Sequence, residues 1–272
     1  MATPIGNLGD ITIRALETLA AADGVLAEDT RVGRKLLTHY GIDTALQRFD
    51  AHSPDSTHAA IAARIFGGAA IALTSDAGTP LISDPGEPLV AAVRAAGAKV
   101  FPVPGASAVI AALAGGGLPA ESFFFDGFLP QKSGARRRRL RELAAIPGTL
   151  VFYEAPHRAV GALEDAAAVF PERRAVIGRE LTKTFETFYS GTALELHDLF
   201  AAMPEVKGEI VLMIAPPEAE AAQALDLDAA LADALETLSV KDAASVVAAK
   251  AGLPRREVYA RAVELAAKRK PA

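Results

Sequence analysis

Short apolar segments alternate with helix-forming segments through the first 117 residues, and this alternation constrains the fold most. Apolar runs at 25–27, 70–74 and 99–103 have the length of buried strands. Helical patterns are predicted at 12–22, 32–40 and 57–66. Repeated alternation of this kind predicts an α/β domain, in which helices cover a parallel sheet.

Two loops in this region have the composition of a ligand site. One is Ser75–Gly86 and the other is Pro102–Ala108, and each joins a predicted strand to an alanine-rich, helix-like run. Open α/β sheets bind ligands at the carboxyl ends of their strands, and glycine there lets the backbone approach a ligand closely. Asp76 and Asp84 can accept hydrogen bonds, and neither loop has a lysine or arginine to meet a phosphate. A small polar ligand without phosphates is therefore expected.

Residues 118–217 have a different pattern. Strands are predicted at 122–128, 148–154, 174–179, 185–190 and 209–215, with helices near 136–144 and 157–170. Two of these strands follow each other directly, which predicts a mixed sheet with an antiparallel portion. Gly115–Pro119 indicates a domain boundary, and Pro216–Pro217 with the Ala/Glu-rich stretch up to Gln223 indicates a linker.

The tail, residues 225–272, is predicted to form three helices. An alanine-rich helix, a turn at Gly252 and a second helix from near Pro254 match the plan of a helix-turn-helix. Arg255 and Arg256 then lie at the start of the second helix, where recognition residues usually lie. An ordinary helical hairpin that packs on the body of the protein is the alternative.

Composition and missing motifs exclude several classes of site. The chain has no cysteine, which excludes disulfides and thiolate metal sites, and its histidines lack ligand spacing, so no metal is expected. The glycine fingerprints for dinucleotides and for triphosphates are missing. Gly105-Ala106-Ser107-Ala108 resembles the start of a nucleophile elbow, but Val109 occupies its second glycine position. Without a signal peptide or a spanning segment, the expected location is the cytoplasm.

Basic residues are concentrated locally although the net charge is −5. One cluster comprises Lys132, Arg136, Arg137, Arg138, Arg139 and Arg141, and a second comprises Lys268, Arg269 and Lys270. A charge run can simply be a solvated helix face. Four consecutive arginines cover every side of one helical turn, however, and repel one another, so they need a compensating partner. The phosphate backbone of a nucleic acid is a natural one. Arg136, Arg137, Arg138 and Arg139 are therefore predicted to bind such a backbone, with Arg255 and Arg256 in the tail.

A series of ordered motifs resembles one known family. The motifs are Thr3–Thr12, Ala27–Arg31, Ser75–Gly86, Pro104–Ala108, Gly127–Pro130, Phe152–Arg158, Arg179–Lys183 and Lys207–Glu209. Together they resemble the ribosomal RNA small subunit methyltransferase I family, of the tetrapyrrole-methylase-like superfamily. The resemblance implies transfer of a methyl group from S-adenosylmethionine to the ribose 2′-hydroxyl of a cytidine in the decoding region of 16S rRNA. It also implies that RNA is the partner of these arginines, that the protein acts on the 30S subunit, and that it is a homodimer.

The fold implied is two α/β domains of the class III methyltransferase type, residues 1–117 and 118–217, followed by the helical tail. The cofactor would lie in the cleft between them. Expected cofactor contacts are Asp76, Ala77, Gly78, Ser107, Ala108, Tyr153, Glu154 and Gly208. An alternative role, that of shaping the turn without touching the cofactor, applies to Thr79-Pro80 and Asp84-Pro85-Gly86. The substrate side of the cleft is expected to include Gly6 and Asn7.

A base or a charge-stabilising group would help the weakly acidic ribose hydroxyl to react. The candidates are Glu28, Asp29, Glu154, Glu180 and Lys183, and the residues alone do not choose among them. Asp29 with Arg31 could equally be a structural ion pair. Glu180 and Lys183, spaced three apart, could be a surface pair, but their position at a strand end favours the cleft.

Two further points stay open at the level of sequence. The family normally has a short apolar strand before the Thr3–Thr12 motif, whereas this sequence starts Met1-Ala2-Thr3. A late start codon or a truncation would explain the difference, and a missing strand would lower the stability of the fold.

The alternative functions are methylation of a tetrapyrrole-like small molecule on the same fold and a catalytically silent RNA-binding assembly factor.

Overall fold

The computed structural model describes residues 1–50, 53–217, 219–251, 253 and 255–269. Contacts divide the chain into two compact units, Met1–Ala215 and Pro216–Ala272. Within the described residues, no helix is long and apolar enough to cross a membrane.

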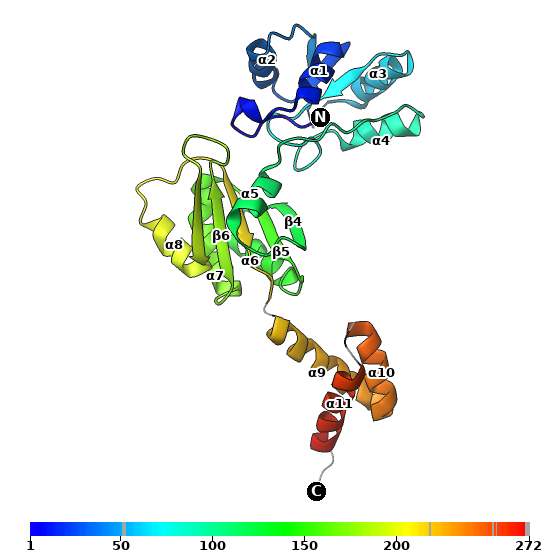
Figure 1. The fold of residues 1–272 in the computed structure, drawn as a ribbon, viewed down its shortest axis with the longest axis vertical. Coiled ribbons are helices and arrows are strands. Elements are labelled where there is room, and N and C mark those ends of the chain that lie inside the picture. Colours follow the sequence, from blue (N-terminus) through cyan, green and yellow to red (C-terminus); the bar gives the residue numbers. More distant parts are fainter. Residues whose placement is uncertain (51–52, 218, 252, 254, 270–272) are drawn as a thin grey trace. The chain divides into compact units, whose positions relative to one another are not determined.

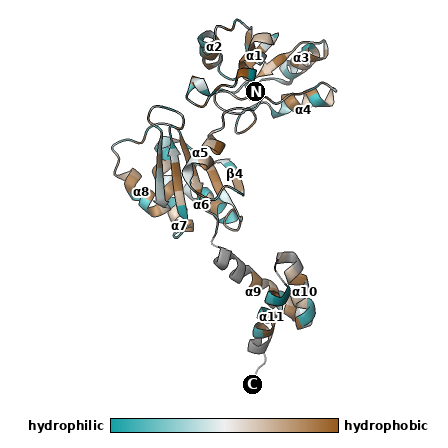
Figure 2. Cartoon of the chain, viewed as in Figure 1, coloured by the Kyte–Doolittle hydropathy of each residue, from teal (hydrophilic) through white to brown (hydrophobic). Residues whose placement is uncertain are grey.

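The first sheet of the larger unit is parallel, with strand order β2-β1-β3. Its strands are β1 (Gly24–Ala27), β2 (Leu46–Arg48) and β3 (Ile71–Leu73). The helices of this part are α1 (Ile13–Ala21), α2 (Thr30–His39), α3 (Asp55–Phe66) and α4 (Glu87–Ala95), and a short 3-10 turn spans Leu8–Asp10. In Figure 2, α3 and α4 carry both hydrophobic and hydrophilic residues, and the buried ones pack with the sheet residue Leu26. The predicted parallel sheet is confirmed.

Two predictions for this sheet were wrong in detail. β2 has only one half-buried residue, Leu46, and its weak apolar signal was missed. Residues 99–103 were predicted as a strand but form no ladder, because Pro102 and its neighbour Pro104 have no N–H to donate. The first residues of the chain lie between β3 and this segment. The amine of Met1 donates to Leu73 O at the end of β3, and Ala2 N donates to Val103 O at 3.0 Å.

The second sheet has the order β4-β5-β8-β6-β7. Figure 1 labels three of these strands, β4, β5 and β6. The strands are β4 (Phe123–Phe128), β5 (Thr149–Glu154), β6 (Arg174–Arg179), β7 (Thr187–Thr192) and β8 (Ile210–Ile214). β4 and β5 are parallel, and the pairs β5–β8, β8–β6 and β6–β7 are antiparallel. The predicted mixed sheet, with β6 and β7 in direct succession, is confirmed.

Alternate residues of the central strands face opposite sides of this sheet, as the two-residue period of a strand requires. Leu150 and Phe152 pack in one core with α6 (Ser133–Glu142), α7 (Ala159–Val169) and α8 (Ala193–Ala201). A 3-10 turn, Pro156–Arg158, precedes α7, and α8 was not predicted. Val151 packs on the other side with α5 (Ala108–Gly116).

Glycines let α5 lie close to the second sheet. A Cβ on Gly115 would lie 2.5 Å from Phe188, and one on Gly116 would lie 2.3 Å from Met213. These glycines were interpreted as a domain boundary, whereas the structure uses them as contact points between a helix and a sheet. The division of residues 1–217 at Gly117 stays a prediction.

The smaller unit contains α9 (Ala219–Thr237), α10 (Val240–Ala251) and α11 (Arg255–Arg269), which confirms three helices in the tail. Its own core includes Leu231, Val247 and Val258. The predicted linker was too long, since the helix begins at Ala219 and not after Gln223. Gly252 and Pro254, which carried the predicted turn, lie outside the described residues.

Candidate functional site

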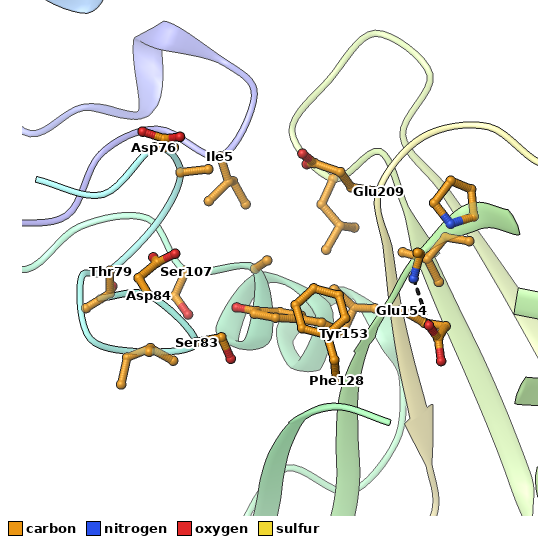
Figure 3. Close-up of a pocket in the computed structure, with 18 of the residues that line it drawn as sticks. Ile5, Asp76, Thr79, Ser83, Asp84, Ser107, Phe128, Tyr153, Glu154 and Glu209 are labelled. Carbon is orange, nitrogen blue, oxygen red and sulfur yellow. Dashed lines mark hydrogen bonds between the residues drawn. The ribbon is translucent and has the colours of Figure 1, made fainter. Parts of the chain in front are cut away.

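The larger unit contains a cavity of about 440 Å³, lined by loops that follow strands of the first sheet and by strands and loops of the second sheet. Figure 3 shows Asp76, Thr79, Asp84 and Ser107 on one side, and Phe128 and Tyr153 on the opposite side. This volume is in the usual range for a small-molecule or cofactor site.

Strand ends explain why these residues converge. Glu28 directly follows β1, and Asp76 lies in the loop after β3. Because these two strands are parallel, both residues lie at the same edge of the sheet. In the second sheet, Glu154 ends β5 and pairs with Ile210, which begins the antiparallel strand β8. The loops at the two sheet edges therefore meet at the cavity, as expected for open α/β sheets.

Carboxylates dominate the polar lining. Five of the lining residues are acidic, and none is lysine or arginine; the acidic ones are Glu28, Asp76, Asp84, Glu154 and Glu209. Burial, followed by the charges of Glu28 and Asp76, raises the pKa of Asp84 to about 6. Burial also raises the pKa of Glu28, with a further contribution from the charge of Asp76. The pocket therefore suits a positively charged ligand and disfavours a phosphorylated one.

The loop that presents Asp84 has an unusual backbone. Leu81 and Ser83 have φ values of 73° and 64°, and Gly86 has a φ of 132°. Non-glycine residues rarely adopt this region, and such strain clusters at functional sites. Asp84 was offered as a hydrogen-bond acceptor for the ligand, with a role in shaping the turn as the alternative. Its signal was available as the second aspartate of the Ser75–Gly86 loop, but sequence could not show that the loop bends it into the pocket.

Aromatic and aliphatic side chains form the facing wall. The ring of Tyr153 packs edge-on against Phe125 at 4.8 Å and against Phe128 at 5.6 Å between centroids. Burial, then the charges of Asp84 and Glu209, raises the pKa of the Tyr153 hydroxyl. A flat apolar ligand group fits such a wall. Sequence reasoning missed the pocket residues Ile5, Phe128, Leu181 and Ile210, because their apolar types do not distinguish a pocket wall from a core.

Six of the eight predicted cofactor residues line the cavity: Asp76, Ala77, Ser107, Ala108, Tyr153 and Glu154. Gly78 and Gly208 are not among the lining residues. Gly78 exchanges backbone hydrogen bonds with Thr3, at 2.8 and 3.1 Å, with a φ of 83°. A Cβ on Gly208 would lie 2.4 Å from the Glu180 side chain.

The predicted base candidates differ in their surroundings. Glu28 and Glu154 line the cavity, whereas Asp29, Glu180 and Lys183 are not among its lining residues. Asp29 caps α2 and pairs with Arg31 at 2.6 Å. Its hydrogen bonds with Arg31 lower its pKa to about 2. This makes Asp29 a weak base, in line with the structural interpretation.

Glu180 and Lys183 form a cluster beside the pocket. Lys183 Nζ lies 2.7 Å from Glu180 and 3.0 Å from Glu209, the second of which lines the cavity. The Lys183 and Glu209 N–H bonds lower the pKa of Glu180. Gly6 was predicted on the substrate side, but a Cβ there would lie 2.5 Å from the Lys183 side chain, so Gly6 leaves space for this lysine.

The structure corrects the prediction that the arginines of α6 need an external partner. Arg136 is buried and donates to Asp165 at 2.7 Å, and Arg137 donates to the same carboxylate. Arg139 pairs with Asp126 at 2.6 Å. Internal carboxylates therefore neutralise these three arginines. Arg138, by contrast, is exposed on α6.

The arginines of the tail are at the surface of their unit. Arg255 and Arg256 are the first two residues of α11, and both are exposed. Among the described parts of the chain, no group of three or more acidic, histidine or cysteine side chains is arranged to hold a metal ion.

Comparison with known proteins identifies the family. Residues 2–197 match the model of Tetrapyrrole (Corrin/Porphyrin) Methylases, and residues 221–266 match the model of the RsmI C-terminal HTH domain. A protein of Mesorhizobium japonicum named ribosomal RNA small subunit methyltransferase I is 47% identical, over 97% of this chain and 90% of that relative. The chain belongs to this family. A family member of Pseudomonas aeruginosa is 45% identical over 97% of this chain and 95% of its own.

Solved structures show the same fold at lower identity. A cobalt precorrin-4 methyltransferase matches with a TM-score of 0.60 and 16% identity, over 78% of this chain and 92% of that one. Uroporphyrin-III C-methyltransferase of Thermus thermophilus, complexed with S-adenosyl homocysteine, matches with a TM-score of 0.54 and 18% identity, over 79% and 95%. Residues 2–197 therefore have the fold of the tetrapyrrole methylases. The helical unit that follows them matches the C-terminal HTH domain of this chain's own family.

Proposed function

We propose that this chain transfers a methyl group from S-adenosylmethionine to the ribose 2′-hydroxyl of a cytidine in 16S rRNA, in the decoding region of the small subunit. The observation that carries the proposal is an acidic, aromatic-walled pocket in a member of the ribosomal RNA small subunit methyltransferase I family. Its strand-end loops also carry the motifs of that family.

The lining of the pocket fits S-adenosylmethionine. The molecule carries positive charge on its sulfonium and amine, and the lining residues offer five carboxylates and no competing cation. Its adenine is flat and apolar on its faces, and Tyr153 with Phe128 provides a matching wall. When bound, the cofactor supplies an electrophilic methyl group.

Individual residues divide the work of holding the cofactor. Asp76 Oδ1 accepts from Asp29 N at 2.9 Å, which orients its carboxylate toward the site. We assign Asp76 to the amine or ribose hydroxyls of the donor, with Ala77, Ser107 and Ala108 providing backbone contacts. Gly78 and Gly208 act indirectly: the first holds the loop to Thr3, and the second leaves space for Glu180.

RNA would be held outside the pocket. Lys132, Arg138 and Arg141 are exposed on and beside α6, and no ion pair of theirs is found among the described residues. They therefore replace the buried Arg136 in the proposed contact with phosphates. Arg255 and Arg256 provide a second basic site at the start of α11, where backbone N–H groups also favour a phosphate.

The proposed setting follows from the same family. We place the enzyme in the cytoplasm, acting on the assembled 30S subunit, as a homodimer.

Transfer of labelled methyl from S-adenosylmethionine tests this function. Purified protein should label 16S rRNA in 30S subunits that lack the modification and should leave uroporphyrinogen unlabelled. Labelling of the tetrapyrrole alone would favour the small-molecule alternative. Cofactor binding with no transfer to either substrate would favour the silent assembly factor.

A further inference from the structure

Three of the pocket carboxylates accept from backbone N–H groups or form ion pairs with lysine or arginine. Asp76 accepts from the backbone of Asp29, and Glu209 pairs with Lys183. Glu154 accepts from Ala155 N at 2.9 Å and lies 3.1 Å from Arg158. Glu28 and Asp84 have no lysine or arginine ion-pair partner among the described residues. These two carboxylates therefore keep oxygen lone pairs available to a ligand.

The charged groups next to the pocket are poorly suited to take a proton. The pKa of Asp29 is lowered to about 2 and that of Glu180 is also lowered, so both are weak bases. Lys183 is held between two carboxylates, and although burial opposes this, the net effect of these neighbours raises its pKa. It remains an ammonium ion without a lone pair.

Asp84 and Glu28 are both partly buried, but three features favour Asp84. It follows the left-handed residues Leu81 and Ser83, which turn the loop into the cavity. It is partly buried on the side of the pocket that faces Tyr153 (Figure 3). Its pKa of about 6 is also close to neutral pH, where a carboxylate is both ionised and basic enough to act.

We propose that the carboxylate of Asp84 accepts the proton of the acceptor hydroxyl during methyl transfer. This role rests on the proposed function. The hydroxyl oxygen forms the new O–C bond with a lone pair, and the C–S bond breaks with its electron pair remaining on sulfur, which becomes a neutral thioether. The electron pair of the O–H bond stays on oxygen, and the proton passes to Asp84 and then to water.

The surroundings of Asp84 set its pH response. The groups that face it are Glu28 after β1, Asp76 after β3, the Tyr153 hydroxyl on β5 and the Ser75 hydroxyl, whose hydrogen bond lowers the pKa. Below about pH 6, Asp84 is protonated and cannot accept, so the rate should fall tenfold per pH unit. Removing the charge of Glu28 should move this inflection to lower pH.

The test is single-turnover methyl transfer to 30S subunits by the full-length protein between pH 5 and 8.5. Asp84→Asn should slow transfer at least 100-fold and abolish the inflection near pH 6, since general base catalysis commonly contributes about 10²–10⁴-fold. Its affinity for S-adenosylmethionine, measured by calorimetry, should change far less than the rate. Asp84→Glu should recover part of the rate and keep an inflection.

Glu28→Gln is a second test, because it removes a neighbouring carboxylate. Whatever its rate, it should move the inflection to lower pH, which also tests the proposal if Asp84→Asn does not fold. Glu172→Gln, at an exposed position outside the pocket lining, is the matched control and should keep the wild-type rate and inflection. Wild-type rate and inflection in Asp84→Asn would overturn the role of Asp84. Equal losses of rate and cofactor affinity would also overturn it, by assigning Asp84 to the methyl donor. A wild-type protein inactive on 30S subunits would overturn the proposed function itself.

Discussion

At the scale of single residues, the two aspartates of the Ser75–Gly86 loop have different environments. Asp76 is oriented by the backbone of Asp29, whereas Asp84 is surrounded by other carboxylates. Sequence could predict Asp76, because an aspartate directly after a strand is well placed for a ligand. Sequence offered Asp84 as an acceptor too, but it could not decide between that role and shaping the turn, because the position of Asp84 depends on the left-handed backbone at Leu81 and Ser83.

Asp76→Ala should weaken S-adenosylmethionine binding at least tenfold. A hydrogen bond to a charged group is worth about 1.5–3 kcal/mol, and the substitution also removes the acceptor for Asp29 N. Calorimetric titration measures the effect, with Asp10→Ala on the exposed surface as the control. Equal affinity in wild type and Asp76→Ala would remove Asp76 from the cofactor site.

Asp84→Asn should stabilise the fold at neutral pH. A carboxyl whose folded pKa is raised contributes stability that is fully present below its unfolded pKa of about 4 and is lost as pH rises through about 6. The gain at pH 7.5 should be about 1 kcal/mol, less than the full shift implies because the side chain is partly exposed. Urea unfolding at pH 7.5 and 4 measures it. A destabilisation of equal size at both pH values would contradict this environment for Asp84.

At the scale of elements, α6 shows where composition misleads. Four consecutive arginines suggest one basic surface, but a helix distributes successive residues around its axis. Arg136 therefore faces the core beside α7, where Asp165 compensates its charge, and Arg138 faces solvent. Sequence predicted the helix but could not assign its faces, because the partner Asp165 lies 29 positions away.

The faces of α6 predict opposite effects of two arginine substitutions. Arg136→Ala should lower the free energy of unfolding by about 3 kcal/mol, since it leaves the buried Asp165 carboxylate partly uncompensated. Arg138→Ala with Arg141→Ala should change stability by less than about 0.5 kcal/mol each but lower the salt dependence of RNA binding. Urea unfolding and RNA titrations between 50 and 200 mM salt, about the range over which phosphate contacts are resolved, separate the two.

Two outcomes would contradict the assignment of Arg136 to the core and of Arg138 and Arg141 to RNA binding. If Arg136→Ala is as stable as wild type, the network with Asp165 is not a structural element. If the salt slope of the Arg138 and Arg141 double variant equals that of wild type, this face of α6 does not contact RNA.

At the scale of the whole molecule, sequence predicted the class of the fold better than its connections. Most of the strands and helices, the mixed sheet and the helical tail were predictable from apolar periods. The short strand β2 and the packing of α5 on the second sheet were not, because both depend on contacts between distant segments. Most of the pocket residues lie within the family motifs. The motifs carry information about which residues meet in three dimensions, and local apolar patterns do not.

The smaller unit should serve substrate recognition. Arg255→Ala with Arg256→Ala should reduce methylation of 30S subunits at least tenfold, because charge-assisted phosphate contacts are lost, while cofactor affinity stays unchanged. Lys241→Ala, on the exposed start of α10, is a control in the same unit. Loss of cofactor affinity and thermal stability together would instead make this unit a packing element. Unchanged activity on 30S subunits would remove these arginines from recognition.

The central claim, methyl transfer to a ribose in 16S rRNA, is tested most directly by mass mapping of that RNA from 30S subunits treated with the protein and S-adenosylmethionine. The account predicts one added methyl group, on the ribose of a cytidine in the decoding region. Untreated subunits, and subunits treated with Asp76→Ala at limiting cofactor, should lack it. A methyl group on a base, on another RNA region or on no RNA at all would contradict the account.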